Sequence, residues 1–253
     1  MKSKICLILV FLFLVTGIIS AQNSIKLSNG EWEPYLSENL KHYGVASHIV
    51  TQAFQNAGIQ VDYVFLPWKR AYEDAKAGKV HGSLIWSYVE ERTQDFYYSD
   101  TVIISESVFF HLKSKNFEWS SAGDLKKYKI GGTIGYKYKF QEEPGGDALV
   151  LDEASSDELN FKKLLNNRID AFPVSKDVGY AMITSNFLPR EVKQFTHHSK
   201  PYDQTKFFLL LSRAVPENEQ IVKKFNEGLA KLKSSGKYDK YLLDSNKGRY
   251  KKK

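Results

Sequence analysis

The chain has 253 residues, of which 42% are hydrophobic and 14% are aromatic, so it can bury a substantial core and is not a disordered or low-complexity protein. A length prior of roughly 100–200 residues per domain allows one large domain or two small ones. The formal charge of +7 lies at the ends, because residues 1–21 hold two lysines, residues 247–253 hold five basic residues, and neither stretch has an acid. The remaining 29 basic residues match the 29 acidic ones, which disfavours a nucleic-acid groove.

The first residues have the pattern of a secretory signal peptide. Lys2 and Lys4 precede an apolar run that begins at Ile5, and the small pair Ser20-Ala21 follows it. The alternative is a membrane anchor, but the apolar run is shorter than the roughly 20 residues that cross a bilayer. We therefore expect residues 1–21 to be removed near Ala21. The single cysteine, Cys6, leaves with them, so we expect a periplasmic chain with no disulfide and no thiolate metal site.

The first half of the remaining chain alternates strands and helices. The spacing predicts strands over residues 24–28, 59–66 and 80–86, and helices over residues 44–58 and 67–78. Gly30 and Pro34 interrupt the segment after the first strand. A strand, helix, strand, helix, strand order over about sixty residues predicts parallel strands with right-handed crossovers.

The same alternation returns in the second half. Strands are predicted over residues 106–114, 128–132, 148–151, 169–174 and 206–212, and helices over residues 136–141, 157–166, 176–185 and 221–232. The predicted fold class is α/β, with two lobes joined by two extended segments. Lobe 1 is expected to be discontinuous, over residues 22–110 and 205–246, with lobe 2 over residues 111–204. Residues 247–253 are expected to form a disordered basic tail, with lipid or partner binding as a minor alternative.

The segment from Pro67 to Asp100, PWKRAYEDAKAGKVHGSLIWSYVEERTQDFYYSD, resembles the periplasmic solute-binding proteins of family 3, the receptors of polar amino-acid uptake. Five further pieces agree in the same order: WEPY, the helix from Gly44, DLKKYKIGGTIGY, NNRIDAFPV and FNEGLAKLKSSGKYDKYL. The resemblance implies the two-lobed type II periplasmic binding protein fold, with a two-segment hinge and sheets flanked by helices. It also implies a non-enzymatic, monomeric receptor without cofactor or metal, which binds a small molecule for an ABC-type permease.

Arg92 is the strongest candidate for a ligand contact. Its position after a strand is where α/β sheets place ligands, and a guanidinium matches a carboxylate in a bidentate pair. On composition alone, Arg92 would be a surface residue in a charged turn. The resemblance places it at the arginine that holds a ligand carboxylate in the family.

Aromatic residues near strand ends are further candidates, because they can cover the apolar part of a ligand and orient it with a polar tip. The alternative is that they cover the edge of the core. A helix start after GGTIG would offer backbone N–H groups to an anion. The candidates are Trp32, Tyr35, Trp86 and Tyr88, followed by Tyr136 and Tyr138 after the GGTIG loop.

Two positions depart from the family pattern. The aspartate that takes the α-amino group corresponds to Ser175, with Asp177 as a substitute if its helix turns it inward. His81 replaces an aspartate in the first lobe and is expected to be structural. We therefore expect a carboxylate-bearing solute rather than specifically an α-amino acid.

Other function classes have less support in the sequence. The histidines show no HExxH spacing and no GxSxG motif is present, which disfavours the common zinc and serine hydrolases. The alternatives are a sensory or scavenging module on the same fold, or an enzyme that resembles cyclohexadienyl dehydratases.

Overall fold

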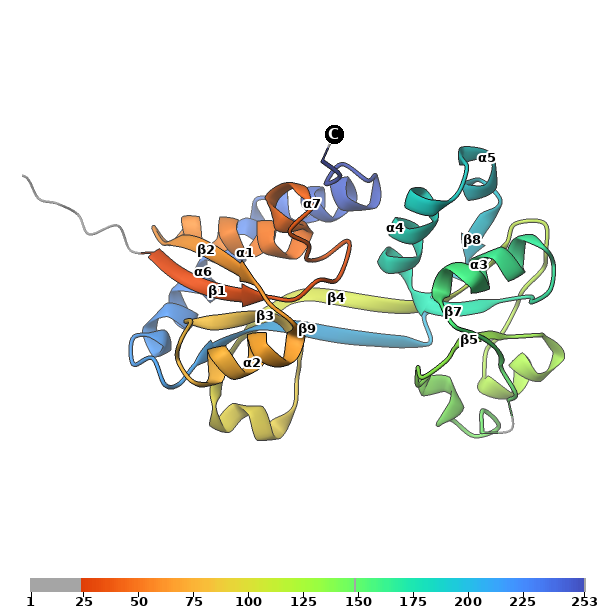
Figure 1. Ribbon diagram of the computed structural model, residues 1–253, viewed down its shortest axis with the longest axis horizontal. Helices are drawn as coiled ribbons and strands as arrows, with labels where there is room; N and C mark the ends of the chain where they lie inside the picture. The colour runs from red at the N-terminus through yellow and green to blue at the C-terminus, as the bar shows by residue number, and fades with distance from the viewer. Residues whose placement is uncertain (1–23, 148, 253) are drawn as a thin grey trace, which may run out of the picture.

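The computed structural model describes residues 24–147 and 149–252 and shows two lobes joined by two long strands (Figure 1). The predicted signal peptide and its Cys6 lie outside the described residues. Within the described residues, no helix has both the length and the apolar character needed to span a membrane. The two-lobed α/β fold is the predicted one.

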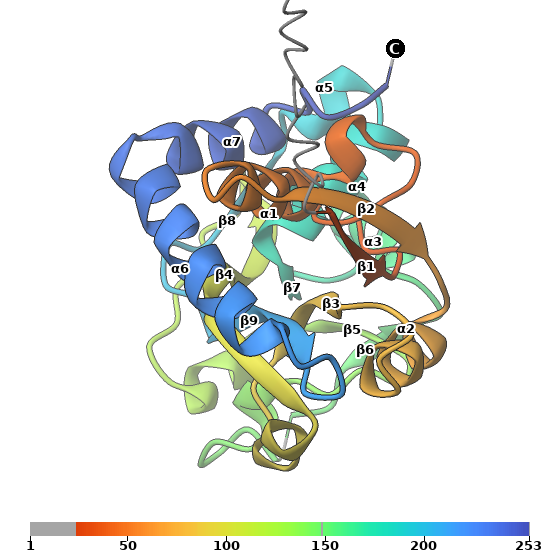
Figure 2. The same cartoon turned by 90° about the vertical axis from the view of Figure 1, so that its left-hand side faces the viewer.

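Lobe 1 is built on parallel strands β1 (Ser24–Asn29), β2 (Gln60–Phe65) and β3 (Gly82–Ser87), in the order β2-β1-β3. The crossovers are the predicted helices α1 (Val45–Gln55) and α2 (Trp68–Lys76). Figure 2 shows α1 and α2 on opposite faces of this sheet. Helix α1 packs against α6 (Asn218–Ser234), which continues into α7 (Lys237–Asn246).

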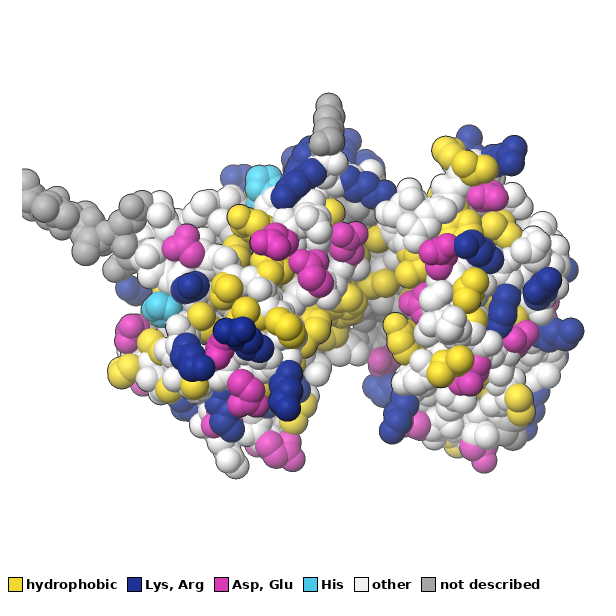
Figure 3. All heavy atoms as spheres, viewed as in Figure 1, with side chains coloured by type: hydrophobic (Ala, Val, Ile, Leu, Met, Phe, Trp, Pro, Cys, Tyr) yellow, Lys and Arg dark blue, Asp and Glu magenta, His cyan; other side chains and the backbone are white. Residues whose placement is uncertain are grey.

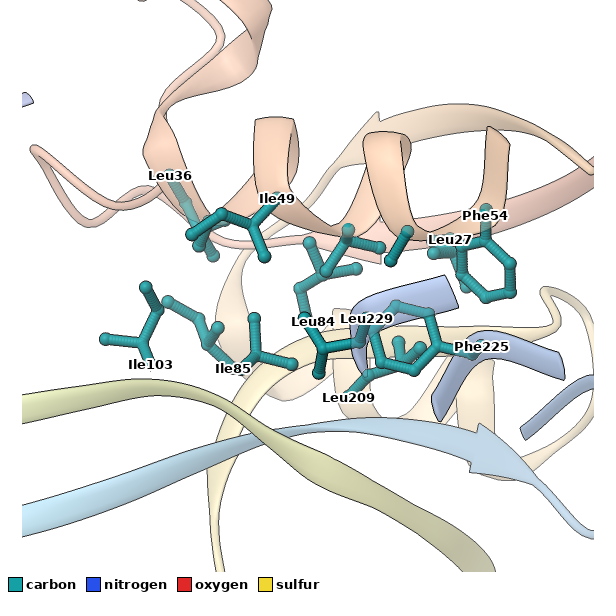
Figure 4. Close-up of a cluster of buried hydrophobic side chains, with 14 of the residues drawn as sticks. Leu27, Leu36, Ile49, Phe54, Leu84, Ile85, Ile103, Leu209, Phe225 and Leu229 are labelled. Carbon is teal, nitrogen blue, oxygen red and sulfur yellow. The ribbon is translucent and has the colours of Figure 1, made fainter. Parts of the chain in front are cut away.

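The core of lobe 1 lies between the sheet and helices α1 and α6 (Figure 4). Side chains from these elements are almost fully buried, and each contributes about 1.5–3 kcal/mol relative to an exposed position. The innermost are Leu27, Ile49, Phe54, Leu84, Leu209, Phe225 and Leu229. The apolar period seen in the sequence at helix α1 is the buried face of that helix.

Strands β4 (Phe96–Leu112) and β9 (Asp203–Ser212) run antiparallel from one lobe to the other and form the hinge. The first part of β4 pairs with β9, and its last part pairs with β7 (Phe172–Ser175) and β8 (Phe195–His197). Because pairing with β7 starts at Ser107, we propose that the lobe boundary lies there, a few residues before the expected position 110.

Lobe 2 packs two apolar clusters on opposite faces of β4 and β7. Adjacent residues of a strand point to opposite faces, and Phe110 joins a cluster with Phe161 and Phe172, while Phe109 joins one with Phe117 and Phe140. Lobe 2 also contains a two-stranded parallel sheet, β5 (Gly131–Thr133) and β6 (Asp152–Ala154). Its helices are α3 (Asp157–Leu165), α4 (Lys176–Asn186) and α5 (Pro189–Val192).

The 3₁₀ turns of the described residues are η1 (Lys41–Tyr43), η2 (Glu90–Gln94), η3 (Ala122–Lys127) and η4 (Lys139–Gln141).

Two predicted elements of lobe 2 are wrong. The helix expected over residues 136–141 is only the three-residue turn η4, and the strand expected over residues 148–151 is β6, which begins at Asp152. Residue 148 itself lies outside the described residues. In the first case the backbone of Tyr138 is extended, and its hydroxyl accepts a hydrogen bond from the Thr133 amide, so the residues before Lys139 do not join the turn.

The carboxyl-terminal residues are also more ordered than expected. Tyr250 is only 6% exposed, its hydroxyl lies 2.7 Å from His48 Nδ1, and its carbonyl accepts a hydrogen bond from the Lys41 amide. Lys251 pairs with Leu40 in an isolated bridge. The tail is therefore not disordered up to residue 252, because Tyr250 anchors it in lobe 1.

Candidate functional site

A groove separates the two lobes, and its floor carries hydrophobic side chains (Figure 3). Strands β1, β2 and β3 are antiparallel to β9 and therefore run in the same direction as β4, from lobe 1 toward lobe 2. Strand β7 runs antiparallel to β4, and an Ile130–Ala171 bridge makes β5 and β6 parallel to β7. The carboxyl ends of all six strands therefore face one another across the groove, where α/β sheets bind ligands.

Arg92 lies in turn η2, just after the carboxyl end of β3. Its Nη1 donates a hydrogen bond to the Ser87 carbonyl at 3.0 Å, and its Cζ lies 5.0 Å from the Trp86 ring centroid and 5.5 Å from that of Tyr72. The side chain is half-buried. No carboxylate among the described residues lies within 4.0 Å of it. An arginine has five N–H donors, so this oriented guanidinium can receive an anion.

Aromatic side chains of lobe 1 lie around the strand ends. Trp86 donates from Nε1 to Ser83 Oγ at 2.9 Å and meets the ring of Trp68 edge-on at 5.3 Å. Trp32 contacts the ring of Phe207 at 5.0 Å. Tyr88 is 54% exposed, and its hydroxyl contacts the Glu90 carboxylate. Trp32 and Trp86 thus pack against the core of lobe 1 with partly exposed rings, Tyr88 is largely exposed, and a contact of these residues with a ligand stays a prediction.

Trp68 was not predicted as part of the site. It begins helix α2, directly after the end of β2, and its indole covers Gly30 so closely that a Cβ there would lie 2.3 Å from Cε2. The signal in the sequence is Pro67, which is the N-cap of the helix, so that the aromatic residue after it begins the first turn.

Tyr35 occupies a different place from the expected one. Its ring is 1% exposed, so in this conformation it has no surface to offer a ligand. The hydroxyl donates to Asp177 Oδ2 at 2.9 Å and lies 3.4 Å from Ser105 Oγ. Burial, followed by the nearby Asp177 charge, raises the pKa of the Tyr35 phenol above its usual range.

Ser175 belongs to the same polar cluster. Its Oγ lies 2.8 Å from that of Ser105, at the point where β7 leads into helix α4. Asp177, the expected substitute for an amino-group acceptor, accepts a hydrogen bond from Tyr35, and burial raises the pKa of its carboxyl. The structure therefore brings Tyr35, Ser175 and Asp177 together at the hinge, where they connect loop 30–44 of lobe 1 to lobe 2.

Tyr136 and Tyr138 on the loop after β5 differ from each other. Tyr136 is 56% exposed, whereas Tyr138 is 5% exposed and accepts a hydrogen bond from the Thr133 amide at 2.8 Å. Tyr138 is thus part of the lobe 2 core. Because only turn η4 follows this loop, the expected helix start that would receive an anion is absent there.

Lobe 2 presents a buried polar pair at the end of β5 that the sequence did not indicate. Thr133 Oγ1 donates to Asp157 Oδ1 at 2.5 Å and accepts from Asn160 Nδ2 at 3.1 Å. Burial raises the pKa of the Asp157 carboxyl, which is 8% exposed.

His81 lies before β3 in lobe 1, at the end of the strand away from the groove. Its Nδ1 accepts a hydrogen bond from the Lys26 amide at 3.1 Å.

The fold resembles several solved structures of binding proteins. The second substrate-binding domain of Lactococcus lactis GlnP, in open conformation, gives a TM-score of 0.72 at 17% identity, covering 89% of this chain and 96% of that one. The second substrate-binding domain of a putative amino acid ABC transporter from Streptococcus pneumoniae Canada MDR_19A gives 0.69 at 18%, covering 91% and 100%. A histidine kinase sensor domain with similarity to periplasmic binding proteins gives 0.58 at 17%, covering 88% and 96%.

A comparison with curated protein sequences found no match. The family model for bacterial extracellular solute-binding proteins, family 3, matches residues 27–244, which include both lobes, the hinge strands and Arg92. The chain therefore belongs to the bacterial extracellular solute-binding proteins of family 3.

Proposed function

We propose that this protein is an exported, non-enzymatic receptor that captures a small carboxylate-bearing solute between its lobes and delivers it to an ABC-type permease. The observation that carries the proposal is the half-buried Arg92 guanidinium, oriented at the end of β3 with no carboxylate partner among the described residues. A cation held in this way is costly unless an anion completes its hydrogen bonds. The neighbour from a putative amino acid ABC transporter supports transport as the purpose of binding.

Binding begins on lobe 1 in this mechanism. The carboxylate pairs with Arg92, and Trp86 and Tyr88 cover the apolar part of the solute. Lobe 2 then contributes the loop after β5, where Ile134 and Tyr136 are 61% and 56% exposed. Because these contacts form only when the lobes approach, the solute binds the closed form more tightly and shifts the population toward it. A permease would recognise that closed shape.

Substitution of Arg92 tests the proposal. Arg92→Ala removes the charge-assisted pair and is expected to weaken binding of an acidic solute by about 2–5 kcal/mol in isothermal titration calorimetry. Arg92→Lys keeps a charge but loses the planar pair of donors, so it should restore only part of the affinity. Arg70→Ala is the matched control, because the Arg70 side chain is 70% exposed and pairs with Asp74 on the surface of helix α2. Unchanged affinity in Arg92→Ala would reject the role of this residue.

A sensory role is the second candidate, and the likeness to a histidine kinase sensor domain favours it. A sensor would use the same groove and the same closure, but its closed form would bind a signalling protein instead of a permease. Capture of partners by the ligand-loaded protein distinguishes the two roles, because only a transport receptor binds permease subunits reconstituted in lipid nanodiscs. Turnover of a cyclohexadienyl acid by the purified protein would instead support the enzymatic alternative.

A further inference from the structure

The acidic residues around the groove limit what kind of solute it can take. Each of the six strand ends that face the groove is followed by a short loop or a helix start. Within four residues of these ends, β2 and β5 have no acid at all. The other strand ends provide seven acids, which are Glu31, Glu33, Glu90, Glu91, Asp157, Glu158 and Asp177.

The three acids that are buried or half-buried are already engaged. Asp157 accepts from Thr133 at 2.5 Å, Glu158 pairs with Lys162 at 2.6 Å, and Asp177 accepts from Tyr35 at 2.9 Å. Asp177 also faces a pocket between helix α4 and the carboxyl-terminal tail, together with Glu33 and Lys251. It therefore points toward the tail side of the lobe junction.

The four remaining acids are exposed to solvent. Glu31 accepts a hydrogen bond from the Glu38 amide, and Glu90 contacts the Tyr88 hydroxyl. An exposed carboxylate pairs only weakly with a cation, because water screens both charges. Glu106 on the hinge strand β4 also has a partner, because it forms an ion pair with Lys176. The amide of Asn29 at the end of β1 is fully buried and out of reach of a solute.

The groove therefore offers a half-buried cation without a partner but no half-buried carboxylate without one, among the residues that the structure describes. A solute enclosed by lobe closure loses the hydration of all its charges. A carboxylate regains hydrogen bonds at Arg92, whereas an ammonium group would meet only carboxylates that already accept hydrogen bonds from Thr133, Lys162 or Tyr35, and would recover less of its cost of desolvation.

We infer that the solute is an organic acid without an ammonium group, such as a 2-oxo or 2-hydroxy acid, rather than an α-amino acid. The inference rests on the proposed function, since it concerns the same groove and the same arginine. It narrows the substrate class of that groove to carboxylates without an ammonium group.

Matched pairs of acids test this inference. The purified protein is titrated by calorimetry, and screened by thermal shift, with phenylpyruvate and 3-phenyllactate against L-phenylalanine, and with 2-oxoglutarate and 2-hydroxyglutarate against L-glutamate. Within each pair only the group on the α-carbon differs. We expect the oxo or hydroxy acid to bind at least ten-fold more tightly than its amino acid in at least one set.

The outcomes separate the inference from the proposed function. Equal or tighter binding of an amino acid, lost in Arg92→Ala, would overturn the inference and leave the proposed function standing. No binding by any of these acids would count against both. A second variant, Asp177→Asn, should leave the ratio of affinities within about two-fold, with Glu33→Gln as the control. A ten-fold change in that ratio would identify Asp177 as an ammonium partner and would also overturn the inference.

Discussion

The contact between Gly30 and Trp68 leaves no room for a side chain at residue 30. A Cβ there would lie 2.3 Å from Trp68 Cε2, so Gly30→Ala must displace the indole from the groove wall. We expect a loss of about 1–3 kcal/mol in the free energy of unfolding, measured by urea denaturation. Gly123→Ala is the control, since its Cβ would lie 3.7 Å from the nearest atom, Ser121 Oγ. A Gly30→Ala protein as stable as the parent would show that the two residues do not pack as described.

The Asp177 carboxyl makes stability depend on pH in a definite direction. Burial raises the pKa of Asp177 in the folded state, so the folded protein holds this proton more tightly than the unfolded chain does. The contribution of this group is most favourable below the unfolded pKa of about 3.9, and it is lost as pH rises through the folded value.

Asp177→Asn removes this dependence while keeping an acceptor for Tyr35. We therefore expect the variant to gain stability relative to the parent at pH 7.5 but not at pH 3.5, as measured by urea unfolding at both values. The exposed Asp62→Asn serves as the control. The same gain at both values of pH would contradict the assignment.

At the scale of single residues, the sequence indicates which side chains have the chemistry to bind a ligand. It does not show which of them are exposed to one. Arg92 was predicted as a ligand contact because the resemblance places it at the arginine that holds a carboxylate in the family, and because it follows a strand. Tyr35 and Tyr138 were predicted to line the groove, yet both are buried, because an aromatic ring near a strand end can turn inward as easily as outward. Their hydroxyls find partners on distant elements that no local pattern reveals.

At the scale of elements, the carboxyl-terminal tail gives a direct test. Tyr250 fills a buried site in lobe 1 beside His48, so Tyr250→Ala should lower the free energy of unfolding by about 2–5 kcal/mol. Lys247→Ala, an exposed position on the same tail, should have little effect. Thermal and urea unfolding measure both. Equal stability of the two variants would restore the original expectation of a disordered tail.

The helices with a regular apolar period, α1, α3 and α6, were predicted within a few residues of their observed bounds. Helix α7 was missed because none of its large side chains is fully buried, which leaves a weak period. The first part of β4 was missed because exposed Asp100 and Ile104 interrupt its alternation where it passes between the lobes. Strands that serve as a hinge do not have one buried face throughout, so their pattern is irregular.

At the scale of the whole molecule, the alternation of strands and helices was sufficient to predict two lobes and two connecting segments. It also predicted that strand ends would form the site, because parallel strands present their carboxyl ends to one edge. The alternation of strands and helices does not predict the contacts between the lobes. Tyr35 and Asp177 lie 142 residues apart in the sequence, and only the folded hinge brings them together.

The distance across the groove tests closure most directly. Because the only cysteine of the chain lies in the predicted signal peptide, one cysteine at Lys69 and one at Lys137 would be the only two labelling sites in the mature protein. These exposed positions follow β2 in lobe 1 and β5 in lobe 2. Spin labels at both report the separation of the lobes by pulsed electron resonance.

With the acid that gives the largest thermal shift, we predict a shorter and narrower distance distribution in the parent protein. At the same concentration, Arg92→Ala should keep the distribution of the unliganded state. An unchanged distance in a protein that calorimetry shows to be saturated, or closure that persists without Arg92, would contradict the account of a hinged receptor that holds an acid through this guanidinium.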